Sequence, residues 1–227
     1  MHVFYEPRIS ETLTLSDEES KHAVNVLRMT NGETLYVNDG GGNLFYARIV
    51  EAHPKKVKVE LTNRVQTKTV PRQIRIAVAL TRQADRLEWF VEKATELGVR
   101  RIALVVTHNT GRHKLNVERL NKIAIAALKQ SGNVYLPIIT EPTPFKTFIQ
   151  QPDDSLKLIC TAAHETDLKN VVANSMNVTA LVGPEGDFTD DEMKLAIDHQ
   201  YIPVNLGPHR LRTETAAITA AAALALL

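Results

Sequence analysis

The sequence predicts an α/β protein in which a small β-rich domain precedes a larger domain with a parallel sheet. The first 70 or so residues have mostly strand-like patterns, and in 55–62 apolar and polar side chains alternate with a period of two, as in a strand buried on one face. From residue 74 onward, short apolar runs alternate with helical stripes, the pattern of a parallel sheet with helices on both faces. The segment 66–73 has no apolar periodicity, so we expect two domains, 1–70 and 71–227.

The first domain should contain one helix among its strands. Ser16 and Glu19 have the spacing of a capping box, so the helix should begin at Ser16 and carry His22 and Arg28. The three glycines within Asp39–Asn43 are better explained by a hairpin turn that needs positive φ than by a phosphate cradle. The expected strands are 33–38, 44–50 and 55–62.

The second domain should alternate strands and helices up to the C-terminus. A helical stripe from Leu87 to Leu97 ends at Gly98, a residue typical of helix C-caps. The last helix, 216–227, consists of seven Ala, three Leu, one Ile and one Thr. A helix without a polar face must be covered on every side, which burial together with a subunit interface would provide. The expected strands are 74–80, 102–106, 136–140, 156–161, 178–182 and 201–206.

The composition says more about the cellular compartment of the protein than about its function. The 27 Lys and Arg residues against 26 Asp and Glu do not by themselves indicate an RNA-binding protein. Between Lys55 and Arg75, however, seven basic residues accompany only Glu60, which fits either a solvated strand face and linker or a phosphate-binding rim. The single cysteine, the lack of a visible signal segment and the absence of an apolar run of about 20 residues predict a cytoplasmic protein.

Two glycine-centred loops carry most of the functional information. Gly183–Phe188 and Leu206–Ala216 each follow an apolar strand-like run and each lead into a helix. Ligands of open α/β sheets bind at such strand ends, and Thr189 with Glu192 has capping-box spacing for the helix after the first loop. The Gly-x-Gly-x-x-Gly fingerprint of dinucleotide-binding folds is missing, which disfavours a Rossmann-type enzyme.

These loops resemble those of the bacterial 16S ribosomal RNA uridine-N3 methyltransferases, a family of the SPOUT class. The most specific stretch is Leu211–Ala216. The resemblance runs along most of the chain and also includes His22–Arg28, Glu92–Gly98 and Gln130–Ser131. It implies a PUA-like RNA-binding β-barrel domain at 1–70 and a SPOUT α/β knot domain with a parallel sheet at 71–227. It further implies a homodimer, a trefoil knot that general topology rules would not suggest, and 16S ribosomal RNA or the small subunit as partner.

The resemblance also implies S-adenosylmethionine as cofactor, held by the backbone of both loops. N3 of uridine carries a weakly acidic imide proton, so its methylation needs a base or a cation near the uracil. Arg212 and Glu214 are the catalytic candidates, and the alternative is that Arg212 pairs with Glu214 or Glu185 to hold the loop shut. Carried over by position, the cofactor contacts are Leu181, Gly183, Glu185, Gly186, Leu206, Gly207, Leu211, Arg212, Thr213, Glu214, Thr215 and Ala216. The RNA contacts are Arg8, His22, Arg28, Lys55, Lys56 and Lys58.

Some positions depart from the family pattern. Asp187 stands where many relatives have a second glycine, and the segments 108–110 and 129–135 differ from the usual charged residues, so the resemblance specifies the reaction more closely than the RNA position. Methylation of another RNA position, such as a ribose 2′-hydroxyl, and a non-catalytic RNA-binding role stay open. Cys160 lies in an apolar run and is expected in the core. No metal site is expected, because histidines 108, 113, 164, 199 and 209 lack paired ligand spacing.

Overall fold

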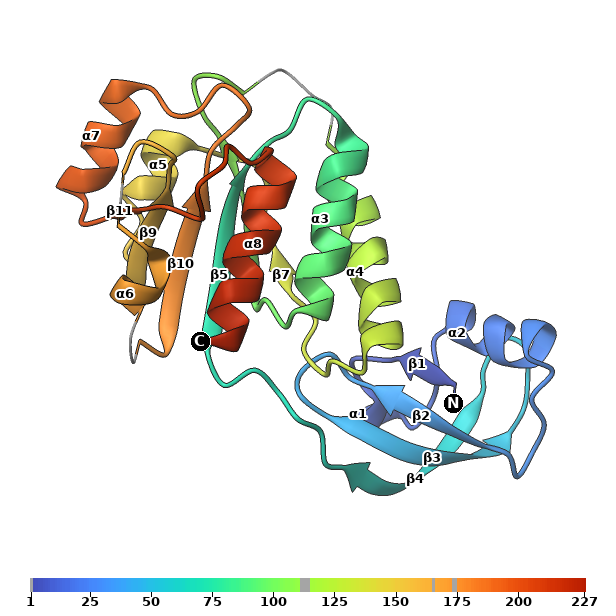
Figure 1. Cartoon of the computed structure of the whole chain (residues 1–227). Helices are drawn as coiled ribbons and strands as arrows, with labels where there is room; N and C mark the ends of the chain where they lie inside the picture. Colours follow the sequence, from blue (N-terminus) through green and yellow to red (C-terminus); the bar gives the residue numbers. More distant parts are fainter. Residues whose placement is uncertain (1, 111–114, 165, 173–174) are drawn as a thin grey trace. The chain divides into compact units, whose positions relative to one another are not determined.

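The computed structural model describes residues 2–110, 115–164, 166–172 and 175–227 and divides the chain into two compact units (Figure 1). Unit 1 comprises residues 1–69 together with 125–136, and unit 2 comprises 70–124 and 137–227. The expected ranges had assigned 125–136 to the second domain. Within unit 1, however, Asn38 Nδ2 donates to Asn133 O at 2.8 Å and Gly42 N donates to Val134 O at 2.9 Å, so this segment packs with the first strands.

A four-stranded sheet forms the centre of unit 1. Its order is β1-β2-β3-β4, with β1 parallel to β2 and the other pairs antiparallel. Leu15 N donates to Val57 O and Val59 N donates to Leu13 O, both at 3.0 Å, so the segment 13–15 continues the sheet beyond β4. The β-rich domain predicted from the period of two is therefore confirmed. The strands are β1 (Val3–Tyr5), β2 (Thr34–Asn38), β3 (Leu44–Glu51) and β4 (Lys58–Val65).

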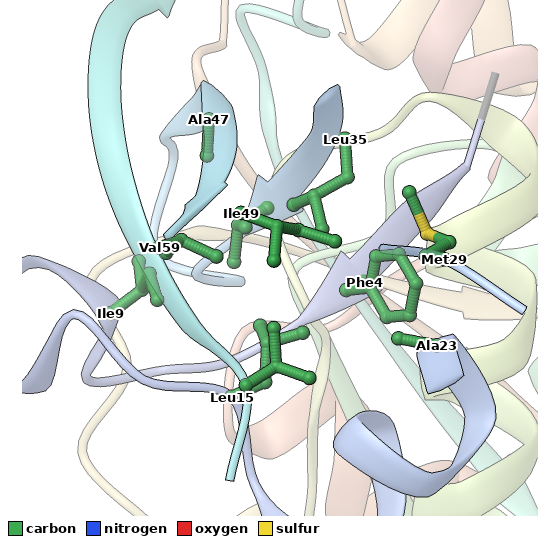
Figure 2. Packing of buried hydrophobic residues seen from close by; sticks show 11 residues of the cluster. Phe4, Ile9, Leu15, Ala23, Met29, Leu35, Ala47, Ile49 and Val59 are labelled. Carbon is green, nitrogen blue, oxygen red and sulfur yellow. The ribbon is translucent and has the colours of Figure 1, made fainter. Parts of the chain in front are cut away.

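Apolar side chains from both ends of unit 1 fill the space enclosed by this sheet. Figure 2 shows Phe4, Leu15, Leu35, Ile49 and Val59 turned toward one another, and each is at most 3% exposed. These side chains come from all four strands and from the segment 13–15, so the sheet and this segment share one core. Burial of this apolar surface is what holds the short strands together.

The turn of unit 1 follows the sequence, but the helical segment after Ser16 ends at Val26, so it carries His22 and not Arg28, which adopts φ +56°. Asp39 Oδ1 accepts from Gly41 N and Asn43 N, which confirms the hairpin turn between β2 and β3. Ser16 Oγ caps the helix by accepting from Glu19 N at 3.3 Å, but Glu19 completes no capping box, because its carboxylate binds Lys129 Nζ at 2.7 Å. The helices are α1 (Ile9–Thr12), α2 (Asp17–Lys21) and the π-helix η1 (His22–Val26).

Unit 2 contains the predicted parallel sheet. The order is β11-β9-β10-β5-β6-β7, every recorded pair is parallel, and β8 also pairs with β6. The sheet thus places β9 between β10 and β11, the two strands that precede the glycine loops. The strands are β5 (Gln73–Ala79), β6 (Arg101–Val106), β7 (Ile138–Ile139), β8 (Thr143–Pro144), β9 (Leu156–Cys160), β10 (Asn177–Val182) and β11 (Ile202–Val204).

Helices cover both faces of this sheet, as predicted. On one face α8 lies along β5 and β10 and beside α3 (Figure 1). On the other face Ala77, Leu181 and Ile159, which are in register across three strands, pack with Phe145 and Ala196 from α5 and α7. The helices are α3 (Ala84–Glu96), α5 (Phe145–Ile149), α6 (Leu168–Val172), α7 (Asp190–Asp198) and α8 (Thr213–Leu226). The helix α4 (Val117–Ser131) begins in unit 2, and its residues from 125 onward belong to unit 1.

The last helix is covered along one side only. Ala217, Ala220, Ala221 and Leu224 are fully buried against the sheet and α3, whereas Leu226 is 86% exposed. The exposed and partly exposed positions recur at the spacing of one helix face. The expectation that this helix is covered on every side is therefore not met within a single chain. Among the described residues, no helix is both long enough and apolar enough to cross a membrane.

Candidate functional site

A pocket lies at the carboxyl edge of the sheet in unit 2, where β9, β10 and β11 end. Because parallel strands end at one edge, their following loops meet there, which is the usual ligand site of open α/β sheets. The pocket is lined by the end of β9, both glycine loops and the first turns of α8. Its residues are Cys160, Thr161, Ala162, Val182, Gly183, Pro184, Glu185, Asp187, Asn205, Leu206, His209, Arg210, Leu211, Thr213 and Ala216.

The first glycine loop is a tight turn held by its neighbours. Asp187 N donates to Pro184 O at 3.0 Å, and Asp187 adopts φ +60°. This left-handed conformation favours glycine and tolerates aspartate, so it accounts for aspartate at a position that resembles a glycine position of the family. Asn109 Nδ2 donates to the carbonyl oxygens of Gly186 at 3.2 Å and Asp187 at 2.9 Å. The predicted capping box of Thr189 with Glu192 is confirmed.

The second loop is fixed through Asn205. Its side-chain Oδ1 accepts from Gly207 N at 2.7 Å, and its Nδ2 donates to His164 O at 2.9 Å. The backbone N–H of Asn205 donates to Thr166 O at 2.7 Å. One asparagine therefore links the end of β11 to the segment that follows β9. This link places the end of β9 beside the two glycine loops in the pocket.

The two loop glycines are needed for different physical reasons. A Cβ on Gly183 would lie 2.9 Å from the ring of Phe188, so this glycine makes room for a side chain of its own loop. Gly207 has open space around it but adopts φ +140°, which residues with a side chain rarely occupy. Each glycine is therefore required by the geometry of its own loop.

The structure brings half of the predicted cofactor residues into the pocket lining. Gly183, Glu185, Leu206, Leu211, Thr213 and Ala216 line it, whereas Leu181, Gly186, Gly207, Arg212, Glu214 and Thr215 do not. Leu181 is fully buried in the core toward α5 and α7, so its side chain points away from the pocket. Sequence reasoning missed the end of β9, Cys160–Ala162, because no glycine marks that strand end.

The two catalytic candidates lie in different surroundings. Glu214 is buried: its Oε1 lies 3.8 Å from Arg86 Nε, and its Oε2 has no hydrogen-bond partner. Arg86 Nη1 also lies 4.0 Å from Glu185 Oε1. Arg212 is exposed, and its guanidinium makes no recorded contact with the described part of the chain. Both carboxylates therefore lie beside Arg86, and the structure does not show the alternative in which Arg212 pairs with Glu214 or Glu185.

Comparison with known proteins assigns the family. The model of the RNA methyltransferase domain matches residues 68–225, and that of the RNA methyltransferase PUA domain matches residues 15–62. The chain belongs to this RNA methyltransferase family. The match spans the parallel sheet and both glycine loops, so the methyltransferase carries its pocket within the shared domain.

Individual relatives cover nearly the whole methyltransferase. Ribosomal RNA small subunit methyltransferase E of Bacillus subtilis is 30% identical, over 94% of this chain and 89% of its own. A probable rRNA-methyltransferase of Porphyromonas gingivalis is 35% identical, with a TM-score of 0.87 over 97% of this chain and 95% of its own. Ribosomal RNA small subunit methyltransferase E of Neisseria gonorrhoeae, bound to S-adenosyl methionine, is 28% identical, with a TM-score of 0.89 over 99% and 96% of the two chains. The family resemblance and the predicted fold class are confirmed.

Cys160 contributes to the pocket floor of the methyltransferase. Burial raises the pKa of its thiol to about 12, so the thiolate that a nucleophile requires is absent at neutral pH. Its place in the core follows the expectation from its apolar run. Within the described residues, no three His, Cys, Asp or Glu side chains form a group able to hold a metal ion, and His113 lies outside those residues.

The predicted RNA contacts lie on the surface of unit 1. Arg8, His22, Arg28, Lys55, Lys56 and Lys58 are all exposed. Lys58 differs from the others, because its Nζ pairs with Glu51 Oε2 at 2.6 Å. Lys58 holds the pKa of the Glu51 carboxyl below its usual value, through a hydrogen bond and its charge.

Part of the basic stretch has a structural role instead. Arg72 is buried, with Nη1 donating to Leu224 O at 2.7 Å and Nε to Ser175 O at 2.8 Å. It thereby satisfies a carbonyl of the last turn of α8. Arg75 pairs with Asp153 Oδ2 at 3.4 Å. Of the two alternatives for this stretch, the phosphate-binding rim therefore does not extend to Arg72 and Arg75.

Proposed function

We propose that this methyltransferase transfers the methyl group of S-adenosylmethionine to N3 of a uridine in 16S ribosomal RNA of the small subunit. The observation that carries the proposal is the pocket formed by both glycine loops at the carboxyl edge of the sheet. Support comes from relatives named ribosomal RNA small subunit methyltransferase E, one of which is solved with S-adenosyl methionine bound.

The residues present fit this cofactor. Thr213 Oγ1 is buried without a hydrogen-bond partner and belongs to a residue that lines the pocket, so a polar ligand group would satisfy it. The backbone of Gly183 and Glu185 lies at the same pocket, where amides and carbonyls can bind adenine and ribose. When bound, S-adenosylmethionine supplies a methyl group on a sulfonium, a good electrophile. The remaining cofactor contacts proposed from the resemblance, such as Gly186, Gly207 and Thr215, neighbour the lining residues in sequence.

The chain must supply charge stabilisation for the uracil. The N3 proton passes to solvent water as the methyl group arrives at N3, and negative charge develops on the uracil oxygens as the proton is removed. Arg212, exposed at the N-cap of α8, is the proposed catalytic residue, because its guanidinium is free to contact those oxygens. The Oε2 of Glu214 is inaccessible in this conformation, so we assign Glu214 an indirect role through Arg86.

Unit 1 is the proposed RNA-binding part of the chain. The exposed cations Arg8, His22, Arg28, Lys55 and Lys56 can neutralise phosphates, while Lys58 must first give up its contact with Glu51. His22 opens the π-helix η1, and its ring packs edge-on against Phe4 with centroids 6.1 Å apart. π-Helices often occur at functional sites, which supports His22 as an RNA contact.

The same proposal includes a homodimer that works in the cytoplasm, where ribosomal RNA is found. Its support is the outward face of α8, which is uncharged and is partly or fully exposed within one chain at Thr215, Thr219, Ala222 and Leu226. A second copy of the chain would bury this face next to the second glycine loop.

Mapping of 16S ribosomal RNA by mass spectrometry tests the reaction directly. Cells lacking the protein should lose one N3-methyluridine, and the purified protein with S-adenosylmethionine should restore it on their RNA or small subunits. Loss of a ribose 2′-O-methyl group instead would favour the alternative RNA target. An unchanged RNA together with no cofactor binding would favour the non-catalytic alternative.

A further inference from the structure

Arg86 connects the two glycine loops from a third segment of the chain. It lies on α3, and its guanidinium faces one carboxylate from each loop region: Glu185 in the first loop and Glu214 at the start of α8. We call these three residues the Arg86 cluster. The two contacts use different nitrogens, Nη1 toward Glu185 at 4.0 Å and Nε toward Glu214 at 3.8 Å. A planar guanidinium can present both nitrogens at once, which a lysine ammonium cannot do.

The cluster is sheltered enough for its charges to matter. The side chains of Arg86, Glu185 and Glu214 are 26%, 28% and 11% exposed. Ion pairs on an open surface contribute little, but a partly buried carboxylate needs a nearby cation. Glu214 is the extreme case, because its Oε2 is buried without a hydrogen-bond partner and Arg86 is its recorded ion-pair partner.

Further contacts place the cluster at the pocket wall. Glu185 Oε1 also accepts from the backbone N–H of Arg82, just before α3, and Glu185 O accepts from Arg210 Nη2 at 3.2 Å. Glu185 and Thr213, the neighbour of Glu214, both line the pocket. The position of Arg86 therefore affects the pocket from both sides without Arg86 itself lining it.

From this geometry we propose that Arg86 is a positioning residue that holds the two glycine loops at the separation required for cofactor binding. The inference rests on the proposed function, since it concerns the same pocket. A residue of α3, outside both glycine loops, would then contribute to cofactor affinity. Removal of Arg86 should let the first loop and the start of α8 separate, and the cofactor would then have to bring them together on binding.

The test compares S-adenosylmethionine binding by calorimetry for the full-length protein and four variants. Arg86→Gln should raise the dissociation constant at least tenfold. It also leaves Glu214 as an uncompensated buried charge, so the double variant Arg86→Gln/Glu214→Gln separates the two effects. The double variant should regain thermal stability relative to Arg86→Gln but keep a dissociation constant at least tenfold above that of the wild type. Arg86→Lys should fall between wild type and Arg86→Gln, because an ammonium reaches one carboxylate at a time.

Arg119→Gln is the matched control. It removes an ion pair with Glu88 on the same helix without a contact to either loop, so its dissociation constant should stay within twofold of the wild type. A folded double variant that binds the cofactor as tightly as the wild type would overturn the role of Arg86 while leaving the proposed function intact. A folded wild-type protein that fails to bind the cofactor would overturn both.

Discussion

Removal of Lys55 and Lys56 should reduce the salt dependence of RNA binding by an amount that the structure allows us to state. Both side chains are exposed and have no recorded ion-pair partner among the described residues, so each can neutralise a phosphate without first breaking an ion pair. Each phosphate contact contributes about 0.7 to 0.9 to the slope of log affinity against log salt, so Lys55→Gln/Lys56→Gln should flatten the slope by about 1.4 to 1.8. Between 50 and 200 mM salt, the ratio of wild-type to variant affinity should then fall by about ninefold.

Lys58 provides the matched comparison within the same strand region. Its ammonium is held by Glu51, so a phosphate would have to compete with a carboxylate that is already in place. Lys58→Gln should therefore change the slope by less than half as much as either exposed lysine. The assay is fluorescence anisotropy with a labelled fragment of 16S ribosomal RNA at several salt concentrations. A double variant with the wild-type slope, or a Lys58→Gln effect equal to that of Lys55→Gln, would refute the reasoning.

Three further expectations concern unit 2. Ala222→Glu, on the uncovered face of α8, should convert a dimer into a folded monomer in sedimentation experiments, whereas Ala221→Glu on the buried face should unfold the chain; a wild-type monomer at micromolar concentration would contradict this. Gly183→Ala should weaken cofactor binding by displacing the Phe188 ring, and Phe188→Leu should restore it; failure of this rescue would indicate direct steric conflict with the ligand. Asp153 should stabilise the fold above the ordinary carboxyl pKa of about 3.9, and this contribution should disappear in urea titrations as pH falls further. Its burial raises the pKa, but hydrogen bonds from Ser155 and Thr179 and the charge of Arg75 outweigh burial and lower it, so Asp153→Asn should lose this part of the acid dependence and an unchanged profile would count against it.

Local patterns predicted the elements of this fold because their signals are contained within a few residues. The capping box at Thr189 and Glu192, the C-cap at Gly98 with φ +81°, and the hairpin turn at Asp39–Asn43 each formed as expected. The dependence on local patterns also explains why one helix and one strand boundary were not predicted. The helix α1 has only four residues, too few for a helical stripe, and β4 begins at Lys58 because Lys56 N donates back to His53 O in a turn.

Long-range pairing was the part that local patterns did not predict. The two glycine loops follow consecutive strands in sequence, but β9 lies between those strands in the sheet, and its end therefore enters the pocket. Arg72 is a second example of a long-range contact that the local sequence did not predict. In the sequence it extends a basic stretch, yet in the structure it is buried against Leu224 O, 152 residues away. The local sequence does not distinguish an arginine that binds the carbonyls of a helix C-terminus from one that binds a phosphate.

The Arg86 cluster explains why the two catalytic candidates, Arg212 and Glu214, lie in different surroundings. The sequence places Arg212 two residues before Glu214, and proximity along the chain made an ion pair between them a natural expectation. At the start of α8, however, Arg212 is the N-cap and Glu214 lies in the first turn, so their side chains leave the helix in different directions. Glu214 turns to α3 and finds Arg86, while Arg212 stays exposed. Glu214 is thus paired with Arg86, more than 120 residues earlier in the chain, and the catalytic role proposed for Arg212 depends on the exposure that this pairing leaves to it.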